Sequence, residues 1–280
     1  MPVAVVCVMG LPGSGKSTLC KELSSSEDVG RILSSLDSSN SSCIIEWISF
    51  DKIEQEKRCG RPEFDPKAWH DARTHVLEYV EDVRRNMHDH NSLRLILLDD
   101  NFYYASMRRR FRPNGIVYLK RSLEQCLSWN MHPRKSGQVP EQVIRRMSAL
   151  MDEPAGSSSC PVLIVDIEEG VIDRMSHDTD FWLRVVESCK ETEKKALSNT
   201  AIPLSERERL LNEFEVALRQ VVHRIFSNNH INQARMRQIS HAKRAALASF
   251  KQHLGGDLEN VSEVRVTLES EFIELVIRLV

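Results

Sequence analysis

One stretch near the amino terminus constrains the fold more than any other feature of the chain. The residues from Val3 to Met9 form a short apolar run, and Gly10-x-x-x-x-Gly15-Lys16-Ser17 follows it directly before a helical pattern. In this strand, loop and helix setting, backbone N–H groups and a helix N-terminus hold phosphate oxygens. The lysine then reaches the β and γ phosphates, and the next hydroxyl ligates Mg²⁺. The residues predicted to bind a nucleotide are Gly10, Leu11, Pro12, Gly13, Ser14, Gly15, Lys16, Ser17 and Thr18.

Short apolar runs without polar alternation recur through the first two thirds of the chain. They are Val3 to Met9, Ile44 to Ile48, Leu93 to Leu98, Ile116 to Leu119 and Val162 to Val165. This pattern is typical of strands that are buried on both faces of a parallel sheet. Helical patterns lie between most of them, at Lys67 to Met87, Leu123 to Trp129 and Glu141 to Met151. The alternation predicts an α/β fold with a doubly wound parallel sheet, of the kind found in P-loop kinases.

After about residue 175 the strand signal weakens and helical periodicity takes over. Ser205 and Glu208 have the spacing of a capping box, and apolar residues then recur at helical intervals from Leu210 to Ile225. A second helix is predicted from about Asn232 to Leu254. We therefore expect a phosphate-binding domain over residues 1–175 and a smaller, mostly helical domain over 176–280. The last twenty residues mix strand and helix periods, so their structure stays open.

Composition narrows the class of protein. Hydrophobic residues make up 41% of the 280 residues, charged residues 28%, and no apolar run approaches the 18 residues of a membrane helix. We therefore expect a cytoplasmic protein without a membrane partner. The formal net charge of −2 excludes a broadly basic surface, although it allows a local basic face. Composition does not indicate an oligomeric state.

Carboxylates follow two of the predicted strands. Asp99 and Asp100 end the third run, and a strand parallel to the first would deliver either of them to the edge where the loop lies. An acid there can hold Mg²⁺ or its water shell, although paired aspartates can also simply begin a turn. Asp51 ends the second run and is a candidate base for an attacking hydroxyl. Its alternative role is to cap a helix that begins at Lys52.

Charge on a transferred phosphoryl group also requires a cation besides Lys16 and Mg²⁺. The segment from Ser128 to Pro140 is rich in helix breakers and positive charge, as expected of a lid, and Arg134 is our candidate within it. Trp69 and Arg73 are expected to pack and cap the helix after the second strand. Trp182 is expected in the core.

These residues together resemble the L-seryl-tRNA(Sec) kinase family, which shares its architecture with the Elongator-associated P-loop ATPases. The resemblance covers about residues 3–150 and is carried by GLPGSGKST, the acid after the second strand, DDNFYYASMR (Asp99 to Arg108) and the lid that opens into VPEQVI. It continues more faintly through residues 176–187. It implies that ATP, with Mg²⁺, donates its γ-phosphate to the serine hydroxyl of a mischarged tRNA. Lys16 and Ser17 would be the loop pair, and Asp51 the base candidate.

The chain departs from this family in the lid. Family members usually carry two arginines four residues apart, the first followed by asparagine, whereas this chain has Trp129 before Asn130. Arg134 matches the second arginine only if the lid holds one extra residue. Arg108, Arg109 and Arg110 are potential substitutes, although Arg108 fits the structural motif of the family better. The departure places phosphotransfer itself in question.

One segment suggests RNA independently of the resemblance. Between His223 and His253 there are six arginines or lysines, at 224, 235, 237, 243, 244 and 251, and no acid. Arg237, Arg244 and Lys251 fall along one helical stripe that could follow an RNA phosphate backbone. A plain solvated face is the alternative.

The function predicted from the sequence is an ATP-dependent kinase that acts on seryl-tRNA(Sec). Two alternatives stay open: a tRNA-associated regulatory P-loop ATPase without phosphotransfer, which the altered lid favours, and a kinase of a small metabolite.

Overall fold

The computed structural model describes residues 3–36, 42–58, 64–86, 92–131, 138–157, 160–166, 178–198, 206–228, 233–254 and 260–279. They divide into two compact units. The first unit comprises residues 1–144 with 152–198, and the second comprises residues 145–151 with 199–280.

The first unit contains a parallel sheet with the strand order β2-β3-β1-β4-β5. The strands are β1 (Val3–Met9), β2 (Ser42–Ser49), β3 (Ser92–Asp99), β4 (Gly115–Lys120) and β5 (Val162–Asp166). Each neighbouring pair is parallel, and the register places Val8 beside Asp99 and Ser49 beside the same residue. The five strands and the parallel sheet predicted from the apolar runs are confirmed.

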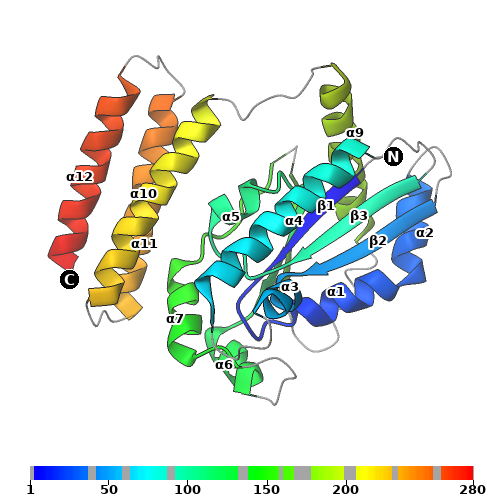
Figure 1. Ribbon diagram of the computed structural model, residues 1–280, viewed down its shortest axis with the longest axis horizontal. Coiled ribbons are helices and arrows are strands. Elements are labelled where there is room, and N and C mark those ends of the chain that lie inside the picture. Colours follow the sequence, from blue (N-terminus) through cyan, green and yellow to red (C-terminus); the bar gives the residue numbers. More distant parts are fainter. Residues whose placement is uncertain are drawn as a thin grey trace. The chain divides into compact units, whose positions relative to one another are not determined.

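Helices of the first unit cover both faces of this sheet (Figure 1). They are α1 (Lys16–Ser25), α2 (Glu27–Leu36), α3 (Phe50–Lys57), α4 (Pro66–Asn86), α5 (Ala105–Arg109), α6 (Leu123–Met131) and α9 (Thr179–Ser198); α7 (Glu141–Leu150) contributes residues to both units. The predicted helices at 67–87, 123–129 and 141–151 correspond to α4, α6 and α7. The sheet with its flanking helices confirms the predicted α/β fold class.

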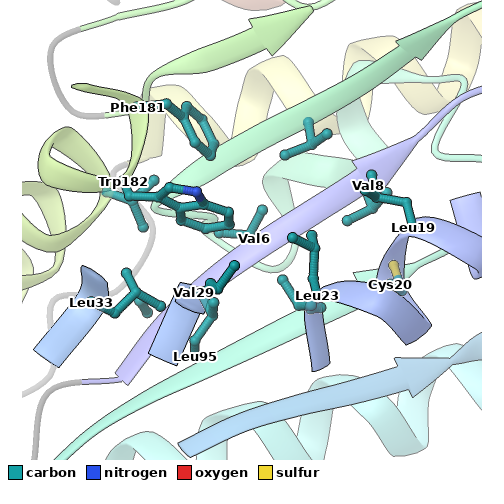
Figure 2. Packing of buried hydrophobic residues seen from close by; sticks show 14 of the residues in the cluster. Val6, Val8, Leu19, Cys20, Leu23, Val29, Leu33, Leu95, Phe181 and Trp182 are labelled. Atoms are coloured by element: carbon teal, nitrogen blue, oxygen red, sulfur yellow. The ribbon is translucent and has the colours of Figure 1, made fainter. Parts of the chain in front are cut away.

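The core on one face of the sheet joins segments that are far apart in the sequence. Side chains of α1, α2 and α9 converge on Val6, Val8 and Leu95 of the central strands (Figure 2). Trp182, in α9, is fully buried there, as predicted. A Cβ atom on Gly115 would lie 2.7 Å from Val185 of α9, so a glycine is needed for this close approach.

Helix α9 therefore belongs to the first unit. Residues 179–198 had been predicted as part of the helical domain, but the buried contacts of this helix are with the sheet. The predicted domain boundary at residue 175 therefore precedes α9, whereas the first unit extends through residue 198. The reason is that apolar side chains of α9 pack on one face of the sheet.

The second unit contains α10 (Glu206–Asn228), α11 (Gln233–Leu254) and α12 (Val261–Leu279), each in contact with the other two. The rings of Phe214 and Phe250 lie 4.5 Å apart between α10 and α11. The predicted helices near 210–225 and 232–254 are confirmed, and the unassigned last residues form α12. None of the helices that the structure describes has the length and hydropathy of a membrane span.

Candidate nucleotide site

The loop between β1 and α1 has the backbone that its glycines predict. Gly10, Gly13 and Gly15 have φ angles of 152°, 88° and 99°. At Gly13 a Cβ atom would lie 2.2 Å from the carbonyl oxygen of Cys126, so α6 packs directly against the loop. Any side chain at this position would force the loop and α6 apart.

Lys16 lies inside this loop. It is buried, and its Nζ donates a hydrogen bond to the carbonyl oxygen of Leu11 at 2.9 Å. Burial lowers the pKa of the Lys16 ammonium, whereas the carboxylates of Asp99, Asp51 and Asp100 act to raise it. The predicted lysine therefore lies close enough to all three predicted acids for their charges to act on its ammonium.

Asp99 is the acid that the structure connects to the loop. Its carboxylate accepts a hydrogen bond from the Ser17 hydroxyl, and its Oδ2 accepts one from the Trp47 indole at 3.2 Å. Burial raises the pKa of Asp99, while Lys16 and these two donors oppose the shift. Ser17 and Asp99, both predicted as metal ligands, thus lie together at the carboxyl edge of the sheet.

Asp100 has a different partner. Its Oδ2 lies 2.6 Å from Nη2 of Arg73, and both side chains are buried. Arg73 had been predicted only to pack and cap α4, so the ion pair was missed. The pattern alone contained no signal for it, because the two residues are 27 positions apart.

Asp51 occupies the first turn of α3, with an exposed side chain. The helix begins at Phe50 with Ser49 as its N-cap, so the alternative in which Asp51 caps a helix from Lys52 is wrong. Asp51 acts electrostatically on Lys16, Asp99 and the buried Glu54. It is therefore accessible and still close enough to influence the loop.

The turn after β3 is held by Arg108. Phe102 has a φ of 44°, in the left-handed region that is uncommon for a bulky residue, and is buried. Arg108 donates to the carbonyl of Phe102 at 2.6 Å and to that of Asp152 at 2.9 Å. The preceding carbonyl, of Asn101, accepts from the Gly10 N–H at 3.4 Å. The structural role expected for Arg108 is confirmed, and Arg109 and Arg110 are exposed.

The predicted lid is described only in part. Helix α6 extends through Met131, so the first residues of that segment are helical, and Arg134 lies outside the described residues. Trp129, at the position of the missing family arginine, is 56% exposed, and the Arg121 guanidinium lies 5.1 Å from its ring centre.

The predicted RNA stripe lies on α11. Arg237, Arg244 and Lys251 are exposed, whereas Ile239 and Phe250 on the other side of the helix are buried. Lys243 is only 1% exposed and contributes nothing to a surface field, so five of the six basic residues counted in the sequence face solvent.

The residues at the loop fit a nucleotide phosphate with its magnesium ion. Ser14 Oγ is buried in the loop without a hydrogen-bond partner in the part of the chain that the structure describes. Ser17 and Asp99 provide two oxygen donors of the kind that Mg²⁺ prefers. The loop and the adjacent end of β3 thus hold the ammonium of Lys16, the hydroxyl groups of Ser14 and Ser17 and the carboxylate of Asp99.

Comparison with known proteins identifies a family. Residues 1–265 match the family described as chromatin associated protein KTI12. Among solved structures, an unliganded sugar kinase from Janibacter sp. HTCC2649 is 16% identical, over 66% of this chain and 98% of that chain, with a TM-score of 0.40. A TM-score of this size supports no statement about activity. No curated protein matches the chain.

The family match supports the Elongator-associated P-loop ATPases that the sequence resemblance included, and does not confirm a seryl-tRNA(Sec) kinase. It covers nearly all of the chain, including both units. The chain belongs to the family of chromatin associated protein KTI12.

Proposed function

We propose that this protein binds and hydrolyses ATP with Mg²⁺ at the β1–α1 loop, and that a tRNA bound to its helical unit controls the turnover. The observation that carries the ATP site is the buried Lys16 in the glycine loop, with the carboxylate of Asp99 close enough to act on its ammonium. Bound Mg²⁺ would supply a Lewis acid that neutralises charge on the phosphates.

The chain's own residues have distinct tasks in this proposal. The loop N–H groups and Lys16 would hold the phosphates, and the hydrogen bond to the carbonyl of Leu11 orients the Lys16 ammonium within the loop. Ser17 and Asp99 would hold the metal. Asp51, exposed on α3, would accept a proton from the attacking water. Arg134 would stabilise charge in the transition state.

The tRNA part of the proposal depends on α11. Exposed Arg237, Arg244 and Lys251 form a cationic stripe on a helix that has no acidic residue. Neutralising phosphates with such residues releases counterions, so binding should weaken steeply with salt.

A second candidate is phosphotransfer to the serine hydroxyl of an aminoacyl-tRNA. The accessible position of Asp51 favours it, because a base in contact with solvent can meet an acceptor hydroxyl as readily as water. The exposed Trp129 in place of a family arginine disfavours it.

One experiment separates these candidates. The protein is incubated with γ-labelled ATP and total tRNA charged with serine. Phosphate release that tRNA stimulates without labelling it supports the proposed ATPase, whereas alkali-labile label on seryl-tRNA supports the kinase. Turnover that is indifferent to RNA contradicts both and favours a small-molecule substrate.

A further inference from the structure

Two adjacent carboxylates at the end of β3 have different surroundings. Asp99 and Asp100 are each 4% exposed. Asp99 is connected to the loop through Ser17, whereas Asp100 is paired with Arg73 of α4 at 2.6 Å. This is a charge-assisted hydrogen bond in a buried setting, the stronger kind.

Arg73 is held in place by more than Asp100. Its Nη1 donates to the carbonyl oxygen of Trp69 at 3.2 Å. Its guanidinium carbon lies 3.7 Å from the ring centre of Trp69 and 5.3 Å from that of Phe50. Contacts with two rings and the hydrogen bond to Trp69 restrict the guanidinium, so the Arg73 side chain is oriented toward Asp100 by the protein itself.

We propose that Arg73 is a positioning residue that withholds Asp100 from the metal and reserves the metal for Asp99. This inference rests on the proposed Mg·ATP site. Without Arg73, Asp100 would lose its ion-pair partner and would add its charge to that of Asp99 beside Lys16. The two carboxylates would attract a free divalent cation to the loop and repel the incoming triphosphate. With Arg73 in place, Asp99 is the one of these two carboxylates that is outside the ion pair, so Mg²⁺ binds tightly only together with the nucleotide.

Four variants test the role of Arg73. Arg73→Met removes the charge and keeps an apolar side chain against Trp69, while Arg73→Met with Asp100→Asn removes both charges. Asp100→Asn alone asks whether Asp100 is a ligand. Arg85→Met is the matched control, because Arg85 is on the same helix but is exposed and forms a surface ion pair with Asp82 at 3.4 Å.

Two affinities are measured by calorimetry: that for Mn²⁺ without nucleotide, and that for ATP with Mg²⁺ or with a chelator. We expect Arg73→Met to bind Mn²⁺ roughly ten-fold more tightly than wild type. We expect it to bind ATP roughly ten-fold more weakly when a chelator removes the divalent cations. The double variant should return both affinities to wild type. Arg85→Met should change neither.

A comparison of Asp100→Asn with Asp99→Asn tests which carboxylate binds the metal, and it can be made even if Arg73→Met fails to fold. We expect Asp100→Asn to keep the Mg²⁺-dependent gain in ATP affinity and Asp99→Asn to lose it. Loss of that gain in Asp100→Asn would make Asp100 a ligand and overturn the inference, as would a folded Arg73→Met with both affinities unchanged. If wild-type protein itself shows no Mg²⁺-dependent ATP affinity, the proposed function falls first, and this inference with it.

Discussion

Asn130 and Val139 hydrogen bond to each other twice, across the segment predicted as a lid. The side-chain Nδ2 of Asn130 donates to the carbonyl oxygen of Val139 at 2.8 Å, and the backbone N–H of Val139 donates to Oδ1 of Asn130 at 3.3 Å. Asn130 is 3% exposed. The pair joins the end of α6 to the residues that precede α7.

Replacing Asn130 with alanine should lower the free energy of unfolding by about 1–2 kcal/mol, because the partly buried backbone groups of Val139 lose their partner. Urea unfolding followed by circular dichroism measures this change. Gln138→Ala is the control, since Gln138 is exposed and donates a hydrogen bond to the carbonyl of Met131. An equal loss in both variants would contradict a special role for Asn130.

Lys16→Ala should abolish ATP hydrolysis together with any phosphate transfer. The substitution removes the buried ammonium that would reach the β and γ phosphates. Phosphate release from labelled ATP is the measurement, with Lys21→Ala, an exposed position on the same helix, as the control. Turnover at the wild-type rate in Lys16→Ala would place the active site elsewhere.

Arg237→Glu combined with Arg244→Glu should raise the KM for tRNA and leave ATP affinity intact. Both side chains are exposed on α11, so the change reverses surface charge without disturbing a core. Titration with tRNA at low salt and at 0.2 M salt measures the effect, and wild type should show the steeper salt dependence. Arg278→Glu, exposed on α12, is the control. No change at low salt would exclude α11 as the RNA surface.

Arg134→Ala should lower the turnover rate strongly, by about 10³-fold or more if this arginine stabilises the transition state. Trp129→Ala should have a small effect, because the Trp129 side chain is largely exposed. Steady-state hydrolysis of both variants under tRNA-saturating conditions is the comparison. A larger loss for Trp129→Ala than for Arg134→Ala would reverse the assignment.

Glu54→Gln should stabilise the protein at neutral pH. Burial is the main cause that raises the pKa of Glu54, which is 7% exposed, while Arg58 and Arg73 oppose the shift. A raised folded-state pKa means that the native protein binds this proton more tightly, so ionising Glu54 costs stability as pH rises above about 4.5. The variant avoids that cost, and its advantage should disappear toward pH 4.

Denaturant unfolding at pH 4, 5.5 and 7 measures the dependence. Glu56→Gln, at an exposed position on the same helix, is the matched control. A Glu54→Gln variant that is less stable than wild type at pH 7 would mean that the Arg58 and Arg73 attractions outweigh burial.

The sequence by itself determined the features that depend on short-range patterns. Apolar runs without alternation indicated strands buried on both faces, and the glycines followed by Lys16 and Ser17 between a strand and a helix indicated a phosphate-binding loop. The chain segment 261–279 shows where this information ends. Its Val264, Val266 and Leu268 alternate as in a strand, but Val261, Phe272 and Val276 are buried in the helical unit as one helix face. Packing against α11 selected between two periods that the local sequence left equal.

Tertiary structure alone decided the partners of charged residues. Asp99 and Asp100 are neighbours of the same type, and only the fold connects one to Ser17 and the other to Arg73. In the same way, Lys243 is buried although the basic Arg244 beside it in the sequence is exposed. Helix α9 packs on the sheet although its helical pattern had placed it with the helices of the second unit. The physical reason is that burial and ion pairing depend on which distant segments pack together. The periodicity of apolar residues indicates only the secondary structure of one segment and which of its faces is apolar.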